Sequence, residues 1–305
     1  TDLLAVKYSS RGPTMSYVNS KSIRLFETFR IVFYTPIYVS LSGGFWDKQG
    51  LDISFATCPP EYPHPLSALR HQVADVVQSG IMRSIISLDW GASTVPLHFA
   101  KINSGDGFFV LRRQSDTPFQ WQDMNGAKVI PVGFSPMPWA SFQYALRSHN
   151  IDPTNLDILH RGSLQEALDT FIAGEAEFVH VPEPTADYLI TEHGAEIAIP
   201  LGSENGHIAY SSFASNPDYL DKNPENIQKF YDGFSEGLKW LSENPPEVVA
   251  ESIKEFFPDA SPEALSRSIS RYKDQNTWPT DPKLDEPEYQ GLQTILMDAG
   301  LVKER

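Results

Sequence analysis

The chain has 305 residues, of which 41% are hydrophobic and 21% are charged. Because single cores stop growing at roughly 250 to 300 residues, this length predicts two lobes, each with its own core. The formal net charge of −15 argues against a nucleic-acid partner, since phosphate recognition depends on clusters of Lys and Arg. No apolar run reaches the roughly 18 to 20 residues of a transmembrane helix, so we expect no membrane insertion.

Cysteine and histidine usage bears on metal and redox chemistry. A single cysteine, Cys58, excludes an internal disulfide and a zinc site built from cysteines. The eight histidines show no spacing typical of zinc ligands. The sequence therefore predicts no metal and no other cofactor.

The N-terminal segment bears on location. Residues 1–14 contain no hydrophobic region followed by a small-residue cleavage site, so they do not resemble a signal peptide. We interpret Met15 as the natural start and residues 1–14 as a remnant foreign to the natural protein, which predicts a cytoplasmic protein. The alternative is a periplasmic or secreted protein whose leader has been removed.

Short β-rich apolar runs alternate with helical segments, which indicates an α/β protein with mixed or parallel sheets. In chain order, strands are predicted near Ile23–Phe33, Leu51–Phe55, Asp75–Gln78, Val95–Lys101, Phe108–Leu111, Lys128–Pro131, Leu156–His160, Glu177–Val181, Glu196–Pro200 and Ile208–Ala214.

Helix boundaries are marked by capping residues. Thr35 and Pro36 predict an N-cap and the first residue of a helix that Gly43 and Gly44 end. Ser163 to Glu166 predicts a capping box.

The C-terminal part lacks strand signals and contains successive helix starts, each with Pro and an acidic residue in the first turn. We expect this helical extension to wrap one lobe. The starts are Asn223-Pro224-Glu225, Pro245-Pro246-Glu247, Ser261-Pro262-Glu263 and Glu286-Pro287-Glu288.

The order of elements predicts how the lobes are built. Residues 20–106 and 205–305 are assigned to the first lobe, together with the C-terminal helices, and residues 107–204 to the second. Two stretches rich in Gly, Ser and Asn, Ile102–Gly107 and Gly202–His207, are the predicted hinges.

Four segments carry a family likeness. Tyr34–Ile53 resembles the opening of the NMT1/THI5-like (SsuA/THI5) substrate-binding proteins, where a Thr-Pro turn leads into a helix that ends in Gly-Phe. Ser67–Gly80, Met124–Phe134 and Ala167–Leu189, the last with its Glu183-Pro184 pair, are similar to later family motifs in the expected order. The resemblance implies a two-lobed periplasmic-binding-protein type II (Venus-flytrap) fold with mixed sheets. Fungal enzymes of this fold that make the thiamin pyrimidine carry a cysteine-rich run, which this chain lacks.

In this architecture a ligand lies between the lobes, against loops that leave the carboxyl ends of strands. Tyr34 and Thr35 join a strand to a helix whose free N–H groups face that position. Ser79 and Gly80 follow the third strand, and Gly80 allows the backbone close to a ligand. Trp90 is a candidate for stacking on a flat ring.

The second lobe contributes further candidates. Ser135 precedes a predicted helix and is our preferred polar contact, while Trp139 suggests a flat wall. Glu183 ends a strand and is a candidate acceptor from an amino-substituted ring, and His180 lies on that strand. The alternative is a purely structural role: Glu183 would be a carboxylate at a helix N-terminus, and His180 would be a hydrogen-bonded core residue.

These features predict a protein that binds a small, planar, polar metabolite, of the thiamin-pyrimidine type, between lobes that close on it. No catalytic residue is assigned, and an ABC permease is a partner only if the protein is exported. The alternative is an enzyme on the same scaffold, a desulfinase, a decarboxylase or a participant in thiamin-pyrimidine synthesis, with Cys58 or His180 in the cleft.

Overall fold

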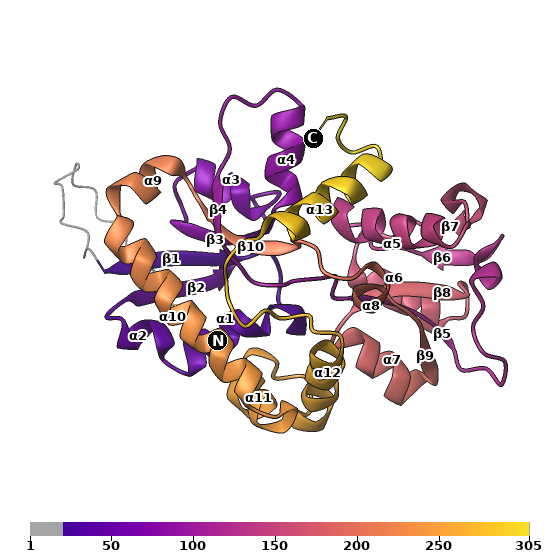
Figure 1. Ribbon diagram of the computed structural model, residues 1–305. Helices are drawn as coiled ribbons and strands as arrows, with labels where there is room; N and C mark the ends of the chain where they lie inside the picture. The colour runs from indigo at the N-terminus through magenta and orange to yellow at the C-terminus, as the bar shows by residue number, and fades with distance from the viewer. Residues whose placement is uncertain (1–20, 305) are drawn as a thin grey trace.

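The computed structural model describes residues 21–304, which form two five-stranded mixed sheets with helices packed on them (Figure 1). The first sheet has the order β2-β1-β3-β10-β4, with β1, β2 and β3 parallel and β10 antiparallel to both neighbours. Its strands are β1 (Ser22–Glu27), β2 (Asp52–Thr57), β3 (Val76–Gly80), β4 (Leu97–Lys101) and β10 (Ser211–Ser215).

The second sheet has the order β7-β6-β8-β5-β9, in which β6 pairs parallel with β7 and β8 while β5 runs antiparallel to β8 and β9. The predicted mixed α/β class is therefore confirmed. Its strands are β5 (Phe108–Arg113), β6 (Lys128–Ile130), β7 (Asp157–Ile158), β8 (Phe178–Pro182) and β9 (Ala195–Pro200).

Helices fill the connections within each lobe. In the first lobe they are η1 (Val32–Tyr34), α1 (Thr35–Ser42), α2 (Phe45–Lys48), α3 (Pro65–Arg70) and α4 (Met82–Asp89). In the second they are η2 (Trp121–Met124), α5 (Pro136–Ser148), η3 (Pro153–Asn155), α6 (Leu164–Ile172), α7 (Thr185–His193) and α8 (Leu201–Asn205).

Each predicted strand has a counterpart, but the first is shorter than predicted. Ile23, Leu25 and Glu27 face inward with the period of two that a strand imposes, and β1 ends there. Val32–Tyr34 is a turn of 3₁₀ helix instead of strand, so Tyr34 becomes the N-cap of α1. The prediction that Thr35 caps this helix is wrong, because its hydroxyl donates to the carbonyl of Val32 at 2.6 Å.

The boundaries predicted at 106/107 and 204/205 fall between strands of the two sheets, and the lobe assignment stays a prediction. Ile102–Gly107 connects β4 to β5. The second predicted hinge, Gly202–His207, is helical up to Asn205, so the extended connection to β10 begins at Gly206. The two connections run together, with the N–H of Ile208 donating to the carbonyl of Ser104 at 2.9 Å.

The C-terminal extension is helical, as predicted, but it contacts both lobes. In Figure 1, α12 lies beside α7 and α13 lies beside α5, while α10 crosses α1. An ion pair between Arg147 on α5 and Asp298 on α13 joins the extension to the second lobe at 2.5 Å. The helices are α9 (Pro217–Lys222), α10 (Pro224–Glu243), α11 (Pro246–Ile253), η4 (Lys254–Phe256), α12 (Pro262–Asp274) and α13 (Glu286–Asp298).

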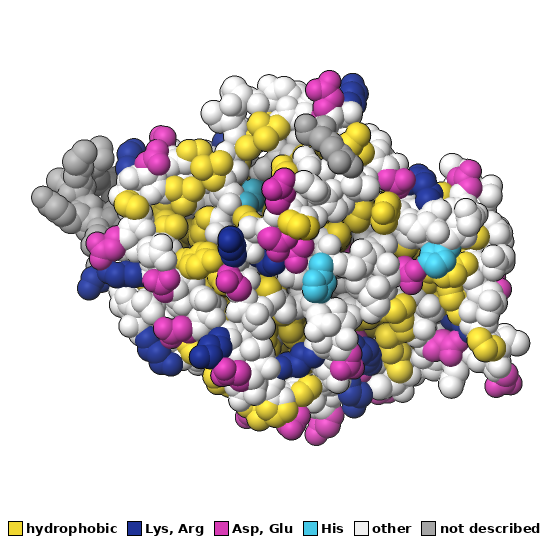
Figure 2. All heavy atoms as spheres, in the orientation of Figure 1, with side chains coloured by type: hydrophobic (Ala, Val, Ile, Leu, Met, Phe, Trp, Pro, Cys, Tyr) yellow, Lys and Arg dark blue, Asp and Glu magenta, His cyan; other side chains and the backbone are white. Residues whose placement is uncertain are grey.

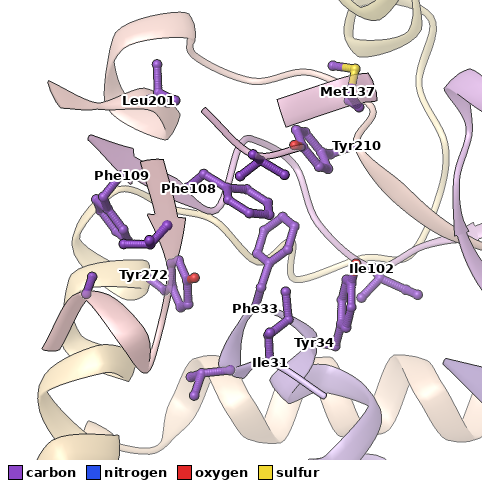
Figure 3. Packing of buried hydrophobic residues seen from close by; sticks show 14 of the residues in the cluster. Ile31, Phe33, Tyr34, Ile102, Phe108, Phe109, Met137, Leu201, Tyr210 and Tyr272 are labelled. Atoms are coloured by element: carbon purple, nitrogen blue, oxygen red, sulfur yellow. The ribbon is translucent and has the colours of Figure 1, made fainter. Parts of the chain in front are cut away.

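An aromatic core joins the lobes beneath the cleft. Figure 3 shows Phe33 between Phe108 of β5 and Tyr272 of α12, and the ring of Tyr210 lies 5.4 Å from that of Phe33. Gly107 passes so close that a Cβ atom there would lie 2.1 Å from Cδ2 of Phe33. The close packing of this core therefore requires glycine at the first hinge.

We predict that Gly107→Ala lowers the free energy of unfolding by about 2 kcal/mol or more, because the added methyl group overpacks the core. Urea unfolding measures the loss. Adding Phe33→Leu tests whether Phe33 is the obstacle. In the Phe33→Leu background, the smaller side chain should reduce the loss in free energy of unfolding that Gly107→Ala causes. Equal costs in both backgrounds would show that Phe33 is not the obstacle.

Asp106 is a fully buried carboxyl group in the first hinge. Its Oδ1 accepts from the N–H of Phe108 at 2.7 Å, whereas Oδ2 has no hydrogen-bond partner among the described residues. Burial raises the pKa of Asp106 from 3.8 to about 7. The unfolded chain therefore releases this proton at lower pH than the folded chain, so the free energy of unfolding falls as pH rises from about 4 to 7.

We predict that Asp106→Asn is more stable than the wild type at pH 8, by about 2 to 4 kcal/mol, and that the difference shrinks toward pH 4. Urea unfolding at several pH values measures it. Asp116→Asn removes an exposed carboxylate and is the matched control, for which no such pH-dependent gain is expected. A constant difference for Asp106→Asn across this range would contradict the raised pKa.

Candidate functional site

The cleft between the lobes holds two adjoining cavities, of about 490 and 520 Å³. Loops that follow the carboxyl ends of β1, β2, β6 and β7 line them, together with the start of α4. Open α/β sheets bind ligands at this position. The two cavities share Pro63, His64, Arg83 and Phe134, so we treat them as one candidate site.

A larger cavity, of about 1040 Å³, lies beside α6, α7 and the loop before α12. It meets the candidate site at Arg30, Ile31 and Leu164. Its wall includes Asp187, which is engaged in ion pairs described below. We place the ligand site in the two smaller cavities because they lie where parallel strands of both sheets end.

Aromatic rings from both lobes form walls of the site. Phe29 of the first lobe and Phe134 of the second meet edge to face, with ring centroids 5.2 Å apart. Tyr62 and Trp139 also line the cavities, and Trp139 is supported from behind by Phe142 at 5.4 Å. Such rings provide flat apolar surfaces for a planar ligand.

The buried carboxylate of Glu27 anchors the loop that carries Phe29. It accepts from the hydroxyl of Tyr38 at 2.6 Å, from Thr57 at 2.8 Å and from Nε of Arg30 at 2.5 Å. Burial raises the pKa of Glu27, although these donors act in the opposite direction. The three donors satisfy the carboxylate and fix this wall of the cleft.

His64 is the N-cap of α3, and its Nδ1 accepts from the N–H of Ser67 at 3.3 Å. Burial, with a smaller contribution from Arg83 and Arg70, lowers the pKa of His64 to about 4. The imidazole is therefore neutral at pH 7, and its remaining proton is on Nε2. His64 can donate a hydrogen bond in the cleft without bringing a charge.

Two predicted residues line the site. Ser135 is the N-cap of α5, yet its hydroxyl makes no capping hydrogen bond. Trp139 lies one turn further along the same helix. The hydroxyl and the indole thus occupy one wall of the second lobe.

Four predicted residues of the first lobe lie outside the cavity walls. Tyr34 is buried beside Ser211 and Gln78, and burial raises the pKa of its hydroxyl. Thr35 is fully buried, Ser79 is buried within β3, and Gly80 is partly buried at the end of that strand. Tyr34 still contacts a wall of the site, since its ring centroid lies 5.9 Å from that of Phe29.

Trp90 and His180 also lie away from the cavities. Trp90 ends α4 and is 78% exposed. His180 is buried in β8 against Phe108 and Phe142, and burial lowers its pKa to about 3. His180 is thus a core histidine in this structure, with Nδ1 accepting from the N–H of Val132 at 3.3 Å.

Glu183 is buried and faces α12 instead of the cavities. Its carboxylate accepts from the N–H of Asp187 at 2.9 Å and from Ser268 at 3.1 Å, and it lies 3.4 Å from Nε of Arg271. Arg271 and Arg267 also pair with Asp187, at 2.6 and 2.8 Å. This ionic network joins the second lobe to the C-terminal extension.

We predict that Arg271→Met lowers the free energy of unfolding by about 3 kcal/mol, because two buried carboxylates lose a partner. Chemical denaturation measures the loss. Lys229→Met breaks an exposed i,i+4 pair with Glu225 and is the control, expected to cost less than about 1 kcal/mol. Similar losses in both variants would show that the network is no more important than a surface pair.

The structure brings into the site several residues that the sequence analysis did not single out. Phe29 and His64 lie in loops, and Arg83 lies three residues after the predicted site residue Gly80. The signal for Arg83 was its position in the first turn of a helix after a strand end, but nothing in the sequence distinguishes it from a surface arginine.

Cys58 lines one of the cavities. Burial raises the pKa of its thiol, with a smaller contribution from Glu61. The thiolate is the nucleophilic form, so this environment disfavours activation of Cys58. Among residues 21–304 no group of three or more His, Cys, Asp and Glu side chains is arranged to hold a metal ion.

Two mixed sheets, two connecting segments and cavities at the strand ends define a two-lobed periplasmic-binding-protein type II fold. The NMT1/THI5-like family model matches residues 33–248, and the chain belongs to this family. No helix in the described part of the chain is both long and apolar enough to cross a membrane. Residues 1–14 and Met15 lie outside the described residues.

The chain is similar to YtlA of Bacillus subtilis (strain 168), named as a binding protein, with 28% identity over 279 residues, 91% of this chain and 83% of YtlA. The periplasmic aliphatic sulphonate binding protein SsuA of Escherichia coli shares the fold, with a TM-score of 0.72 and 18% identity over 93% of this chain and 94% of SsuA. SsuA of Xanthomonas axonopodis pv. citri, bound to MOPS, has a TM-score of 0.70 and 14% identity over 93% and 95% of the two chains.

Proposed function

We propose that this protein is a substrate-binding protein that closes on a small, planar, polar metabolite between its lobes. The observation that carries the proposal is the pair of cavities at the strand ends, walled by Phe29 and Phe134 from opposite lobes. YtlA is named as a binding protein, and the SsuA proteins are sulfonate-binding components, which supports a binding role for this member of the family.

The aromatic walls support a flat ligand, and a thiamin-pyrimidine-like heterocycle is one candidate. Its amino group was expected to meet Glu183, which does not line the two cavities and instead faces Ser268 and Arg271 of α12. The cavity walls therefore support a planar ring in the ligand more than they support an amino group on that ring. The enzyme alternative has less support, because Cys58 is not activated and His180 is outside the cavities.

The cellular location of the protein decides whether it has an ABC permease as its partner. If the protein is exported, as the name of Escherichia coli SsuA states for that protein, it delivers its ligand to an ABC permease. If it begins at Met15 in the cytoplasm, it acts as a carrier or sensor. The mass of the protein purified from its source cells distinguishes a chain that starts at Met15 or Ser16 from one with a processed leader.

Native mass spectrometry of the same preparation tests the binding function. We expect the native mass to exceed the denatured mass by that of a retained small molecule, whose addition to stripped protein should make the particle more compact in small-angle X-ray scattering. Conversion of this molecule to a product by the purified protein would contradict the binding role and favour the enzyme.

Two tryptophan variants test the position of the site. We predict that Trp139→Ala weakens binding of the retained molecule about fivefold or more, because one wall is lost. Trp90→Ala is the matched control, and we expect it to bind as the wild type does, since Trp90 is away from the cavities. Titration calorimetry measures both, and the reverse result would place the ligand elsewhere.

A further inference from the structure

The charge of the candidate site is opposite to that of the whole chain. The chain carries 39 Asp and Glu against 24 Lys and Arg, and on the face shown in Figure 2 acidic side chains are spread among basic ones. Yet no Asp or Glu is among the described residues that line the two cavities, whereas Arg83 lines both of them and Arg30 lines one. The cleft is thus a locally cationic surface in an acidic protein.

Arg83 lies in the first turn of α4, is half-buried and lines both cavities. Its guanidinium makes no ion pair or side-chain hydrogen bond with any residue in the range 21–304. Burial lowers the pKa of Arg83, but a guanidinium stays charged at neutral pH. Five other arginines have acidic partners: Arg24 has Asp75, Arg112 has Glu196, Arg147 has Asp298, and Arg267 and Arg271 have Asp187.

The second arginine of the cleft is already satisfied. Arg30 pairs with Glu27 at 2.5 Å, and its guanidinium lies 5.4 Å from the ring centroids of Tyr38 and Phe256. Its charge is therefore neutralised within the first lobe.

The N-terminus of α5, in the second lobe, is a weaker anion-binding group than Arg83. Helix N-termini bind anions through free N–H groups. In α5, however, Pro136 and Pro138 remove two of the donors in the first turn. Arg83 is thus the main source of positive charge in the described walls of the site.

We infer that the ligand is a planar aromatic anion, whose carboxylate or sulfonate group pairs with Arg83 while its ring lies toward Phe134 and Trp139. This inference rests on the proposed binding function and narrows its ligand class. A neutral ring would leave the guanidinium half-desolvated and unpaired in the closed cleft, which is unfavourable. An anion supplies the missing partner and can accept two parallel hydrogen bonds from the fork of Arg83.

The test compares nicotinate and benzenesulfonate with nicotinamide, which has nearly the shape of nicotinate but no charge. We expect both anions to bind the stripped wild-type protein in titration calorimetry, with nicotinate at least tenfold tighter than nicotinamide. Arg83→Gln should weaken both anions about 10- to 100-fold and leave nicotinamide nearly unchanged. Arg83→Lys, which keeps the charge without the fork, should bind the anions with intermediate affinity.

Lys239→Gln is the matched control, because it removes one positive charge from an exposed side chain of α10. We expect this variant to bind the anions with wild-type affinity. Such a result would show that loss of direct contact with Arg83, and not the change in net charge, weakens binding. Circular dichroism and thermal unfolding establish that each variant is folded, and Arg83→Lys provides the charge comparison if Arg83→Gln is unstable.

The outcomes separate the inference from the proposed function. If nicotinamide binds as tightly as nicotinate, or if Arg83→Gln leaves anion binding unchanged, the anionic ligand class is overturned while the binding function stands. If no probe binds and the protein from its source cells retains no small molecule, the binding function is overturned and the inference with it.

Discussion

The architecture depends on the packing of Phe33 where the two lobes meet. Its carbonyl accepts from the side chains of Asn103 in the first hinge and Trp278 in the C-terminal extension, at 2.8 and 2.9 Å. Its ring fills the space that Gly107 leaves open. The cleft lies above this point, so the position of its walls follows from a core that residues of both lobes and of the extension share.

The C-terminal extension adds a second connection between the lobes. Tyr272 on α12 donates to the carbonyl of Gly107 at 2.7 Å and accepts from the N–H of Glu183 at 3.0 Å. The Asp187 network reinforces this contact, and α13 contacts α5 on another side. Closure of the lobes as we propose would therefore have to preserve or exchange contacts with the extension, in addition to bending the two predicted hinge segments.

The cleft combines aromatic walls with a cation held in place by a folded element. A net charge of −15 disfavours the approach of anions in general, so binding of the anion that we infer would depend on the local field of Arg83 and on exclusion of water by Phe29 and Phe134. Selectivity of this kind would arise because a neutral ligand leaves the guanidinium of Arg83 without a partner.

The sequence alone determined the ten strands, the capping of α6 by Ser163, the starts of the C-terminal helices and the family, because these depend on local periodicity, capping chemistry and motif order. It also pointed to Ser135 and Trp139, which line one of the two candidate cavities, since both follow a strand end. Only the tertiary structure decided that Glu183 and His180 are buried in the core while Arg83 faces the cleft. Which partner a polar side chain meets is set by segments far away in the chain: Arg271 lies 88 positions from Glu183, and no local pattern records that contact.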